Sequence, residues 1–394
     1  MKIVDVAEFY TDQGGGVKTY INQKLKAGSA MGHEILIIAP GRERGEEKRY
    51  GGRVIWVPGP PLPVDPRYVI LWRQKEVHRI LDRERPDVVE GSSPWTGGWF
   101  AGRWQGEAVK SFIFHQDPVA VYPQTILDRL FRRSKIDRIF GFYWRYLRRL
   151  SRKFDVTVVS GEWLKNRLRL FRIKNPQPVS FGIDKEFFST KRRNNKLRKE
   201  LLEELGLPED AKLMIGVSRH HPEKRLGTVI KGFEKASRHQ PMGLMLFGDG
   251  PFRRLVKRQV KGISSVKLKG FTSNRDELAN IMASADYFVH GSAAETFGLV
   301  VAEAICSGLP VIVPSKGGAS DLAFSEISET YEPGDADGLS QAIIRMVNRD
   351  RDELTQACIS VGRHRINTMD DHFRHLFDLY ETMVHQKRGT SGRY

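Results

Sequence analysis

Short apolar, β-branched runs alternate with longer amphipathic stretches along the whole chain. The runs in the first half are Ile3–Ala7, Glu34–Ile38, Val54–Val57, Asp87–Glu90, Phe112–His115 and Val156–Ser160, and those in the second half are Met214–Ser218, Leu244–Phe247, Val266–Leu268, Tyr287–His290 and Val311–Val313. Strands separated by helix-length segments predict βαβ units, in which helices cover both faces of a parallel sheet. Eleven strands are too many for one ordinary sheet. The pattern therefore predicts an α/β protein with two doubly wound, Rossmann-like domains.

The domain boundary is expected between residues 182 and 198. Gly182 ends a strand-like run, and the charged segment Lys191–Glu200 starts a new helix. We predict an N-terminal domain over 1–182 and a second domain over 190–368.

The last segment predicts a helix that packs back on the N-terminal domain, over 369–386. Its apolar residues recur at three- and four-residue intervals, which gives the helix one apolar face: Phe373, Leu376, Tyr380 and Met383. The final residues, Lys387–Tyr394, are expected to fray.

Charge is distributed unevenly over the 394 residues, whose net charge is +17. Residues 1–180 hold 32 Lys and Arg against 19 Asp and Glu, whereas the remainder holds 32 against 28. Such a field attracts anions, namely nucleic acid, acidic lipid or a phosphorylated substrate, although charge that only maintains solubility is the alternative. No apolar run approaches the ~20 residues of a membrane-spanning helix, and we recognise no signal peptide. The two cysteines fit a reduced, cytoplasmic compartment.

Three segments carry candidate chemistry, and each follows a predicted strand. The first is the glycine run Gly14–Gly16 ahead of the predicted helix Val17–Lys26, where backbone amides can approach an anion without obstruction by a Cβ atom. A glycine turn that binds nothing is the alternative. The run lacks the ending of a phosphate-binding P-loop.

The second segment, Ser218–Lys224, places Arg219 and Lys224 where a strand gives way to a loop. Open α/β sheets bind ligands at this position, and two cations there can neutralise a pyrophosphate. A solvated basic loop is the alternative. The adjacent His220 and His221 do not predict a metal, because neighbours in sequence rarely ligate one ion.

The third segment, Glu295–Glu303, is the most specific. Its first carboxylate precedes a helix that starts near Leu299, and its second lies one turn inside that helix. Each carboxylate can accept hydrogen bonds from hydroxyls at separate places on an extended ligand. Between them, the amides of Gly298, Leu299 and Val300 can hold a phosphate. This order suits a nucleotide sugar: sugar, diphosphate and ribose.

The third segment resembles the E-x7-E signature of retaining glycosyltransferases of the GT-B fold, specifically family four. Ser218–Lys224 is similar to that family's G-R-x-x-x-E-K loop, with Ser218 in place of its glycine, and Gly248–Pro251 is similar to its G-x-G-P turn. The resemblance covers essentially the second half of the chain and is patchier in the first half. It implies two Rossmann-like domains facing a central cleft, with the acceptor bound by the N-terminal domain and the nucleotide-sugar donor by the second.

The resemblance also implies roles for individual residues. Arg219 and Lys224 would bind the donor diphosphate, Glu295 the donor sugar and Glu303 the ribose, while His115 would lie near the reacting carbon. The remaining donor-binding residues implied are Gly15, Gly16, Gly248, Phe271, Thr272, Phe297, Gly298, Leu299 and Val300.

The implied reaction is transfer with retention at the anomeric carbon, by same-face attack and without a metal or other cofactor. The single D-x-D sequence, Asp335 to Asp337, precedes an amphipathic stretch and is interpreted as a helix cap. The acceptor would be a glycan, a glycolipid or a polyprenyl-linked sugar, and no nucleic-acid partner is implied. A sugar-nucleotide epimerase of the same architecture, and a non-catalytic protein that binds membrane or RNA, are the alternatives.

The basic segment Ile126–Phe154 holds ten Lys and Arg and two acids. Its apolar residues form one stripe, with Trp144 and Tyr146 off it: Ile136, Phe140, Tyr143, Leu147, Leu150 and Phe154. A basic amphipathic helix with aromatic residues suits the surface of an anionic membrane, which would place the protein at the inner face of the cell membrane. A core helix with a solvated face is the alternative, and Gly141 is expected to interrupt the helix.

Overall fold

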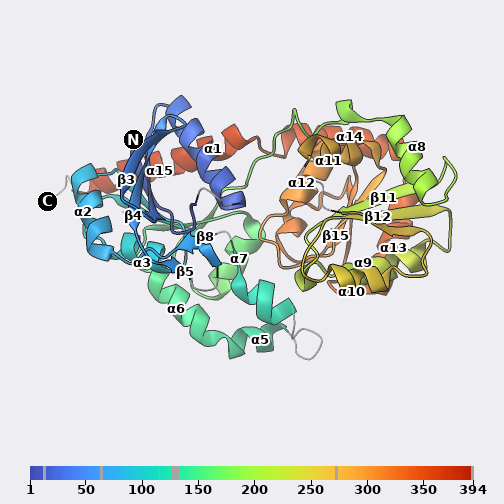
Figure 1. Cartoon of the computed structure of the whole chain (residues 1–394), viewed down its shortest axis with the longest axis horizontal. Coiled ribbons are helices and arrows are strands. Elements are labelled where there is room, and N and C mark those ends of the chain that lie inside the picture. The colour runs from blue at the N-terminus through green and yellow to red at the C-terminus, as the bar shows by residue number, and fades with distance from the viewer. Residues whose placement is uncertain (12–14, 63–64, 115, 126–132, 271–273, 392–394) are drawn as a thin grey trace.

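The computed structural model describes residues 1–11, 15–62, 65–114, 116–125, 133–270 and 274–391. Two lobes lie side by side, each built around its own parallel sheet (Figure 1). Each of the eleven predicted strands overlaps a strand of the structure. The prediction of an α/β protein with two doubly wound domains is confirmed.

The N-terminal sheet has eight strands, all parallel except for the last pair. In spatial order they are β10 (Pro176–Pro178), β9 (Val156–Val159), β8 (Val109–Phe114), β7 (Val88–Gly91), β1 (Lys2–Val6), β2 (Glu34–Gly41), β4 (Gly52–Pro58) and β3 (Gly45–Arg49). Its helices are α1 (Gly16–Ala30), α2 (Gln74–Glu84), α3 (Thr96–Arg103), the π-helical turn η1 (Ala120–Gln124), α5 (Arg133–Ile139), α6 (Gly141–Ser151) and α7 (Glu162–Leu170). A separate hairpin joins β5 (Pro61–Leu62) to β6 (Asp65–Val69).

The C-terminal sheet has six parallel strands. Their spatial order is β13 (Val266–Leu268), β12 (Met242–Phe247), β11 (Lys212–Val217), β14 (Tyr287–Val289), β15 (Val311–Pro314) and β16 (Ser328–Tyr331). Its helices are α8 (Asn195–Glu204), α9 (Leu226–Ala236), α10 (Arg253–Gln259), α11 (Arg275–Ser284), α12 (Leu299–Cys306), α13 (Ala336–Val347) and α14 (Arg351–His364), with single turns η2 (Thr190–Arg192), η3 (Pro222–Lys224) and η4 (Gly318–Leu322).

Burial on both faces explains why the sequence signal for these strands is strong. All six residues of β12, for example, are buried, as expected for a strand in a parallel sheet that helices cover on both sides. The strands that sequence analysis missed are short or lie at a sheet edge, as β3 and β16 do, or form the small hairpin β5–β6. They lack a continuous apolar run.

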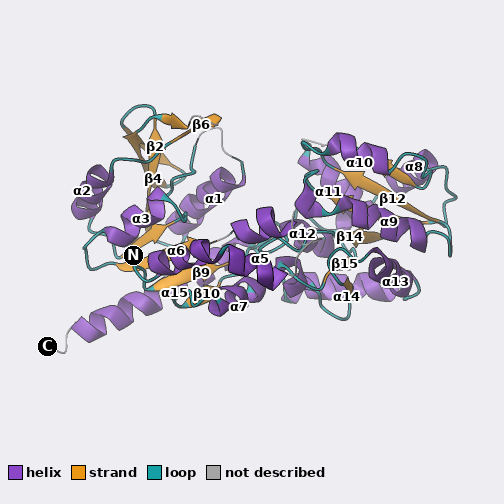
Figure 2. Ribbon diagram, turned by 90° about the horizontal axis from the view of Figure 1, so that it is seen from below, coloured by secondary structure: helices purple, strands orange, loops and turns teal. Residues whose placement is uncertain are grey.

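The C-terminal helix α15 (Met369–Ser391) packs against the N-terminal domain and ends far from the C-terminal sheet (Figures 1 and 2). Its predicted face is buried at Phe373, Leu376 and Tyr380. The expectation that Lys387–Tyr394 frays is wrong as far as Ser391, because Lys387 and Arg388 pair with Asp155 and Asp87 of the N-terminal domain. Residues 392–394 lie outside the described ranges.

A buried ion cluster ties α15 and α1 to the N-terminal sheet. Lys24 of α1 places its Nζ 2.5 Å from Asp5 Oδ2 and 2.5 Å from Glu90 Oε2, and all three residues are at most 1% exposed. The Tyr380 hydroxyl donates to Glu90 Oε1 at 2.6 Å. Burial raises the pKa of Glu90 despite Lys24. Among the described residues, Lys24 is the one cation paired with these two buried acidic side chains.

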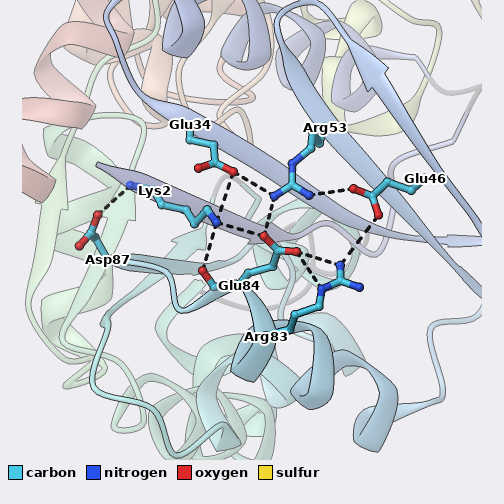
Figure 3. Close-up of polar contacts among 7 residues, drawn as sticks. All are labelled: Lys2, Glu34, Glu46, Arg53, Arg83, Glu84 and Asp87. Carbon is cyan, nitrogen blue, oxygen red and sulfur yellow. Dashed lines mark hydrogen bonds and ion pairs between the residues drawn. The ribbon is translucent and has the colours of Figure 1, made fainter.

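An ion network at the opposite end of the N-terminal strands is partly exposed (Figure 3). Arg53 on β4 contacts Glu34 at 2.9 Å, Glu46 at 2.7 Å and Glu84 at 2.5 Å, and Lys2 joins Glu84 at 3.1 Å. Burial would raise the pKa of Glu84, but hydrogen bonds, chiefly from Arg53, lower it to about 2. The network joins the end of α2 to the amino ends of the strands, away from the cleft.

We predict that Lys24→Met lowers the free energy of unfolding by about 3–5 kcal/mol, because two buried carboxylates lose their cation. Urea titration of the full-length protein measures the change. Lys26→Met is the matched control, since Lys26 is exposed on the same helix and its loss should change stability by at most about 0.5 kcal/mol. Equal effects of the two substitutions would contradict a structural role for the cluster.

Candidate active site in the interdomain cleft

A cavity of about 1410 Å³ lies between the two domains. It is lined from the N-terminal domain by Gly16, Tyr20, Ser92, Trp95 and Phe114, among others, and from the C-terminal domain by Arg219, Lys224, Gly248, Glu295, Phe297, Gly298, Leu299 and Val300. Single-ligand pockets usually measure about 300–1,000 Å³. The cleft is therefore large enough for two substrates at once.

The cationic turn after β11 forms one wall of the cleft. Arg219 is exposed there, and its side chain has no hydrogen bond or ion pair within the described part of the chain. Gly248 follows β12 with φ +135°, and a Cβ atom there would lie 2.0 Å from the carbonyl oxygen of Ser218. Only glycine therefore allows this close approach of the two loops.

Lys224 and Glu295 form the central charged contact. Lys224 Nζ lies 2.5 Å from Glu295 Oε1 and 3.4 Å from Glu223 Oε1. Burial would lower the pKa of Lys224, but the charges of Glu295 and Glu223 outweigh it and raise the pKa. Burial would raise the pKa of Glu295, but the charge of Lys224 and its hydrogen bond lower it instead. Both groups are thus charged at neutral pH.

The loop that carries Glu295 packs against the turn η4, which begins at Gly318. The Gly318 N–H donates to the Glu295 carbonyl at 2.6 Å, and a Cβ atom on Gly318 would lie 2.1 Å from the carbonyl carbon of Thr296. This packing fixes the backbone of Glu295 and leaves its side chain facing the cleft.

The start of α12 presents backbone amides to the same cavity. Gly298 caps the helix with φ +95°, and its carbonyl accepts from Val301 and Ala302, while Leu299 and Val300 line the cleft. The first amides of a helix have no acceptor within it and favour an anion. Arg219, Lys224 and this helix start therefore surround a site that suits a diphosphate.

Glu303 lies one turn inside α12, as predicted, but it is not among the residues that line the cavity. Burial raises the pKa of its carboxyl to about 7, against a weaker opposing effect of Arg275. The Glu303 carboxyl is thus half-buried in α12 without a full counter-charge, and its predicted contact with ribose stays a prediction.

The glycine loop reaches the cleft from the N-terminal domain. Gly16 begins α1 and lines the cavity, whereas Gly15 caps the helix and does not line it. A Cβ atom at either position would meet nothing within 4 Å, so the structure leaves open space where a ligand could approach.

Three predicted site residues, His115, Phe271 and Thr272, lie outside the described residues. Phe114 and Gln116, the neighbours of His115, both line the cavity.

Several contacts across the cleft were not predicted. Ser160 Oγ donates to the Thr296 carbonyl at 2.6 Å, and the Trp163 N–H donates to both carboxylate oxygens of Asp321, at 3.1 and 3.0 Å. Asp321 of the C-terminal domain thus caps α7 of the other domain. Burial raises the pKa of Asp321, although its backbone hydrogen bond from Trp163 opposes the shift. A cap contributed from 158 residues away leaves no local sequence signal.

The described part of the basic segment forms α5 and α6, and the helix is interrupted at Phe140, one residue before the expected Gly141, which begins α6. Within its described residues, the apolar stripe packs into the N-terminal core, which supports the core-helix interpretation of that stripe. The placement of Trp144 off the stripe is wrong, because its ring is 2% exposed and stacks on Phe171 with the ring centroids 3.7 Å apart.

Asp335 caps α13, as predicted, by accepting from the amides of Asp337 and Gly338 at 3.0 Å. His221 lines the cleft while the His220 ring is buried, which separates the adjacent histidines. Among the described residues, no three His, Cys, Asp or Glu side chains gather as a metal site would require. No helix in the described ranges is both long enough and apolar enough to cross a bilayer.

Solved structures share this two-domain arrangement. Sucrose-phosphate synthase from Thermosynechococcus elongatus superposes with a TM-score of 0.73 at 18% identity, covering 98% of this chain and all of that one. The Anabaena protein HepE, solved in complex with UDP, gives a TM-score of 0.70 at 15% identity, covering 96% and 99%. The fold is GT-B, the class of two Rossmann-like domains that face each other across a cleft.

Sequence comparison identifies the family. The model for glycosyltransferase family 4 matches residues 14–187, and the model for glycosyl transferases group 1 matches residues 198–365. A GDP-mannose-dependent alpha-mannosyltransferase of Mycobacterium tuberculosis is 32% identical over 335 residues, which cover 82% of this chain and 81% of that one. A GDP-mannose-dependent alpha-(1-6)-phosphatidylinositol dimannoside mannosyltransferase of the same species is 25% identical over 350 residues, covering 88% and 87%. This chain belongs to the family 4, group 1 glycosyltransferases and is a transferase enzyme.

We predict that the stability of the protein depends on Glu303 between pH 4.5 and 7. The folded-state pKa of about 7 exceeds the ordinary value of 4.5, so the folded state holds the proton more tightly and loses stability as the pH rises through this window. Glu303→Gln removes this loss. Its unfolding free energy relative to wild type should therefore be about 2–3 kcal/mol higher at pH 8 than at pH 5.

Urea titrations at the two pH values test this expectation. Glu186→Gln, which changes an exposed carboxyl, is the control and should show no such difference. A pH-independent gap between Glu303→Gln and wild type would show that the Glu303 carboxyl does not take up a proton in this window.

Proposed function

We propose that this enzyme transfers a sugar from a nucleotide-diphosphate sugar to a glycan, glycolipid or polyprenyl-linked acceptor, with retention at the anomeric carbon and without a metal. The observation that carries the proposal is the Lys224–Glu295 contact, which lies beside Arg219 and the start of α12 in one cavity. Cations and helix amides suit the diphosphate, and the carboxylate suits the sugar hydroxyls beyond it.

Catalysis in this proposal rests on charge that develops on the leaving diphosphate. As the bond from the anomeric carbon to the phosphate oxygen breaks, negative charge grows on that oxygen, and Arg219 and Lys224 stabilise it. The amides of Leu299 and Val300 add to this stabilisation. Two fixed side-chain cations can thus supply the charge that a metal ion supplies in other transferases.

The opposite wall of the cavity supports retention by same-face attack. A double displacement needs a carboxylate nucleophile on the face of the sugar away from the leaving group. The described residues that line the N-terminal wall include no Asp or Glu. The leaving phosphate, which lies on the side where the acceptor attacks, can then accept the acceptor's proton.

GDP-mannose is the first donor to test, because the two mycobacterial relatives are named as GDP-mannose-dependent. The N-terminal wall of the cavity, which we propose to be the acceptor wall, contains Phe9, Pro94, Trp95, Pro118 and Val121. Apolar and aromatic side chains of this kind can stack on a sugar ring or contact a lipid. The wall therefore supports a glycan or glycolipid acceptor.

Association with an anionic membrane is a separate part of the proposal. Ile139 and Phe142 are 53% and 61% exposed at the junction of α5 and α6, where Arg138 and Arg145 flank them. Exposed apolar side chains among cations are typical of surfaces that lie on anionic lipid. This arrangement supports a cytoplasmic enzyme at the inner face of the cell membrane.

For the donor, we expect that one member of a panel of GDP-, UDP- and ADP-sugars raises the melting temperature and is consumed when an acceptor is present. Lys224→Ala and Glu295→Ala should each lower kcat/KM by at least about 100-fold while the fold is retained. Lys231→Ala, on the following helix, is the matched control. Normal turnover in either site variant would contradict the site assignment, and inverted product stereochemistry by NMR would contradict retention.

For the membrane, we expect the double variant Ile139→Ser/Phe142→Ser to bind vesicles of anionic phospholipid at least about fivefold more weakly than wild type. Leu255→Ser is the matched control, because Leu255 is 49% exposed among the basic residues of α10 in the other domain. Cosedimentation measures binding. Equal binding by all three proteins would contradict docking through the α5–α6 junction.

A further inference from the structure

His290 lies directly behind Glu295, where β14 ends and the site loop begins. The residue is 3% exposed, and its Nε2 lies 3.6 Å from Glu295 Oε2. Within the described part of the chain, no hydrogen-bond partner satisfies this buried nitrogen. Buried polar atoms are rarely left unpaired, and an exception beside an active-site carboxylate calls for a functional explanation.

The backbone of His290 is held by two hydrogen bonds to neighbouring strands. Its N–H donates to the Ile312 carbonyl at 2.9 Å, and its own carbonyl accepts from the Tyr331 hydroxyl at 2.8 Å. Ile312 lies on β15 and Tyr331 on β16, which are both strands of the C-terminal sheet. The backbone that carries the imidazole is therefore anchored to the sheet, whereas Glu295 belongs to the loop that follows β14.

The two oxygens of Glu295 have different partners. Oε1 contacts Lys224 at 2.5 Å, and Oε2 faces His290 slightly beyond hydrogen-bond range. A diphosphate that enters the site competes with Glu295 for Lys224, because phosphate oxygens attract the same ammonium group. Glu295 would then be a half-buried carboxylate with a weakened counter-charge, which is costly unless another donor replaces it.

His290 can be that donor. Burial lowers the pKa of the imidazole, so the ring is neutral at neutral pH and carries one N–H. The charged groups that face it are Glu295, Lys224 and Glu223. A shift of a few tenths of an ångström brings Oε2 within hydrogen-bond range of Nε2.

We propose that His290 is a positioning residue, which donates through Nε2 to Glu295 Oε2 when the donor diphosphate draws Lys224 away, and so keeps the carboxylate aimed at the donor sugar. The inference rests on the proposed function, and it assigns to His290 a role in holding the sugar and none in holding the nucleotide.

The test compares the affinity of a nucleoside diphosphate with that of its sugar conjugate. Calorimetry gives both dissociation constants for wild type, His290→Leu, His290→Gln and His290→Asn, with GDP and GDP-mannose or the pair that the donor panel selects. In His290→Leu we expect the nucleoside diphosphate to bind within about twofold of wild type. The added affinity from the sugar should be lost, and kcat should fall by about 10- to 100-fold.

The two amide variants keep the proposal testable if the leucine variant folds poorly. A glutamine amide nitrogen can reach the place of Nε2, whereas the shorter asparagine cannot, so Gln should restore most of the sugar contribution and Asn should not. Equal behaviour of Gln and Asn, unchanged turnover in His290→Leu, or equal weakening of both ligands would each overturn the positioning role. Failure of wild type to bind any nucleotide sugar would instead refute the proposed function.

Discussion

The ion pair between Lys224 and Glu295 is the interaction on which the rest of the site depends. It joins the turn after β11 to the loop after β14, and these two strands are adjacent in the sheet. The two opposite charges lie 2.5 Å apart in a partly buried cleft. Each charge lowers the cost of desolvating the other in this partly buried place. An incoming diphosphate can compete with Glu295 for Lys224. The pair therefore keeps both side chains charged in the cleft until the proposed donor binds.

The fold was predictable because a strand that is buried on both faces consists of a continuous run of apolar residues. The residues of β12 form a continuous apolar run, and a parallel strand of this kind needs a helix on either side. Edge strands such as β3, with alternating exposed residues, lack that signal. The burial of Trp144 depends on its contact with Phe171, which belongs to another segment. The periodicity of one helix cannot reveal such a contact.

Much of the site was predictable because its residues follow strands of the two parallel sheets. Arg219, Lys224 and Glu295 were found because parallel strands bring the loops at their carboxyl ends to one edge. Asp321 and His290 were missed for different reasons. Asp321 acts on a helix of the other domain, whereas His290 ends a strand and reads as an ordinary part of it. Only the distance between the His290 ring and Glu295 reveals the relation.

Several contacts join the two domains beside the cleft. Asp321 caps α7 across the boundary, Ser160 binds the carbonyl of Thr296, and the Phe181 ring meets Phe297 edge-on at 5.6 Å between centroids. The last two contacts fall on the loop that carries Glu295. A movement of one domain against the other must therefore pull on that loop. The backbone of Glu295 is also held within its own domain, where the Gly318 N–H donates to the Glu295 carbonyl at 2.6 Å. Closure of the cleft, if it accompanies donor binding, would therefore act on the loop that carries the group proposed to hold the donor sugar.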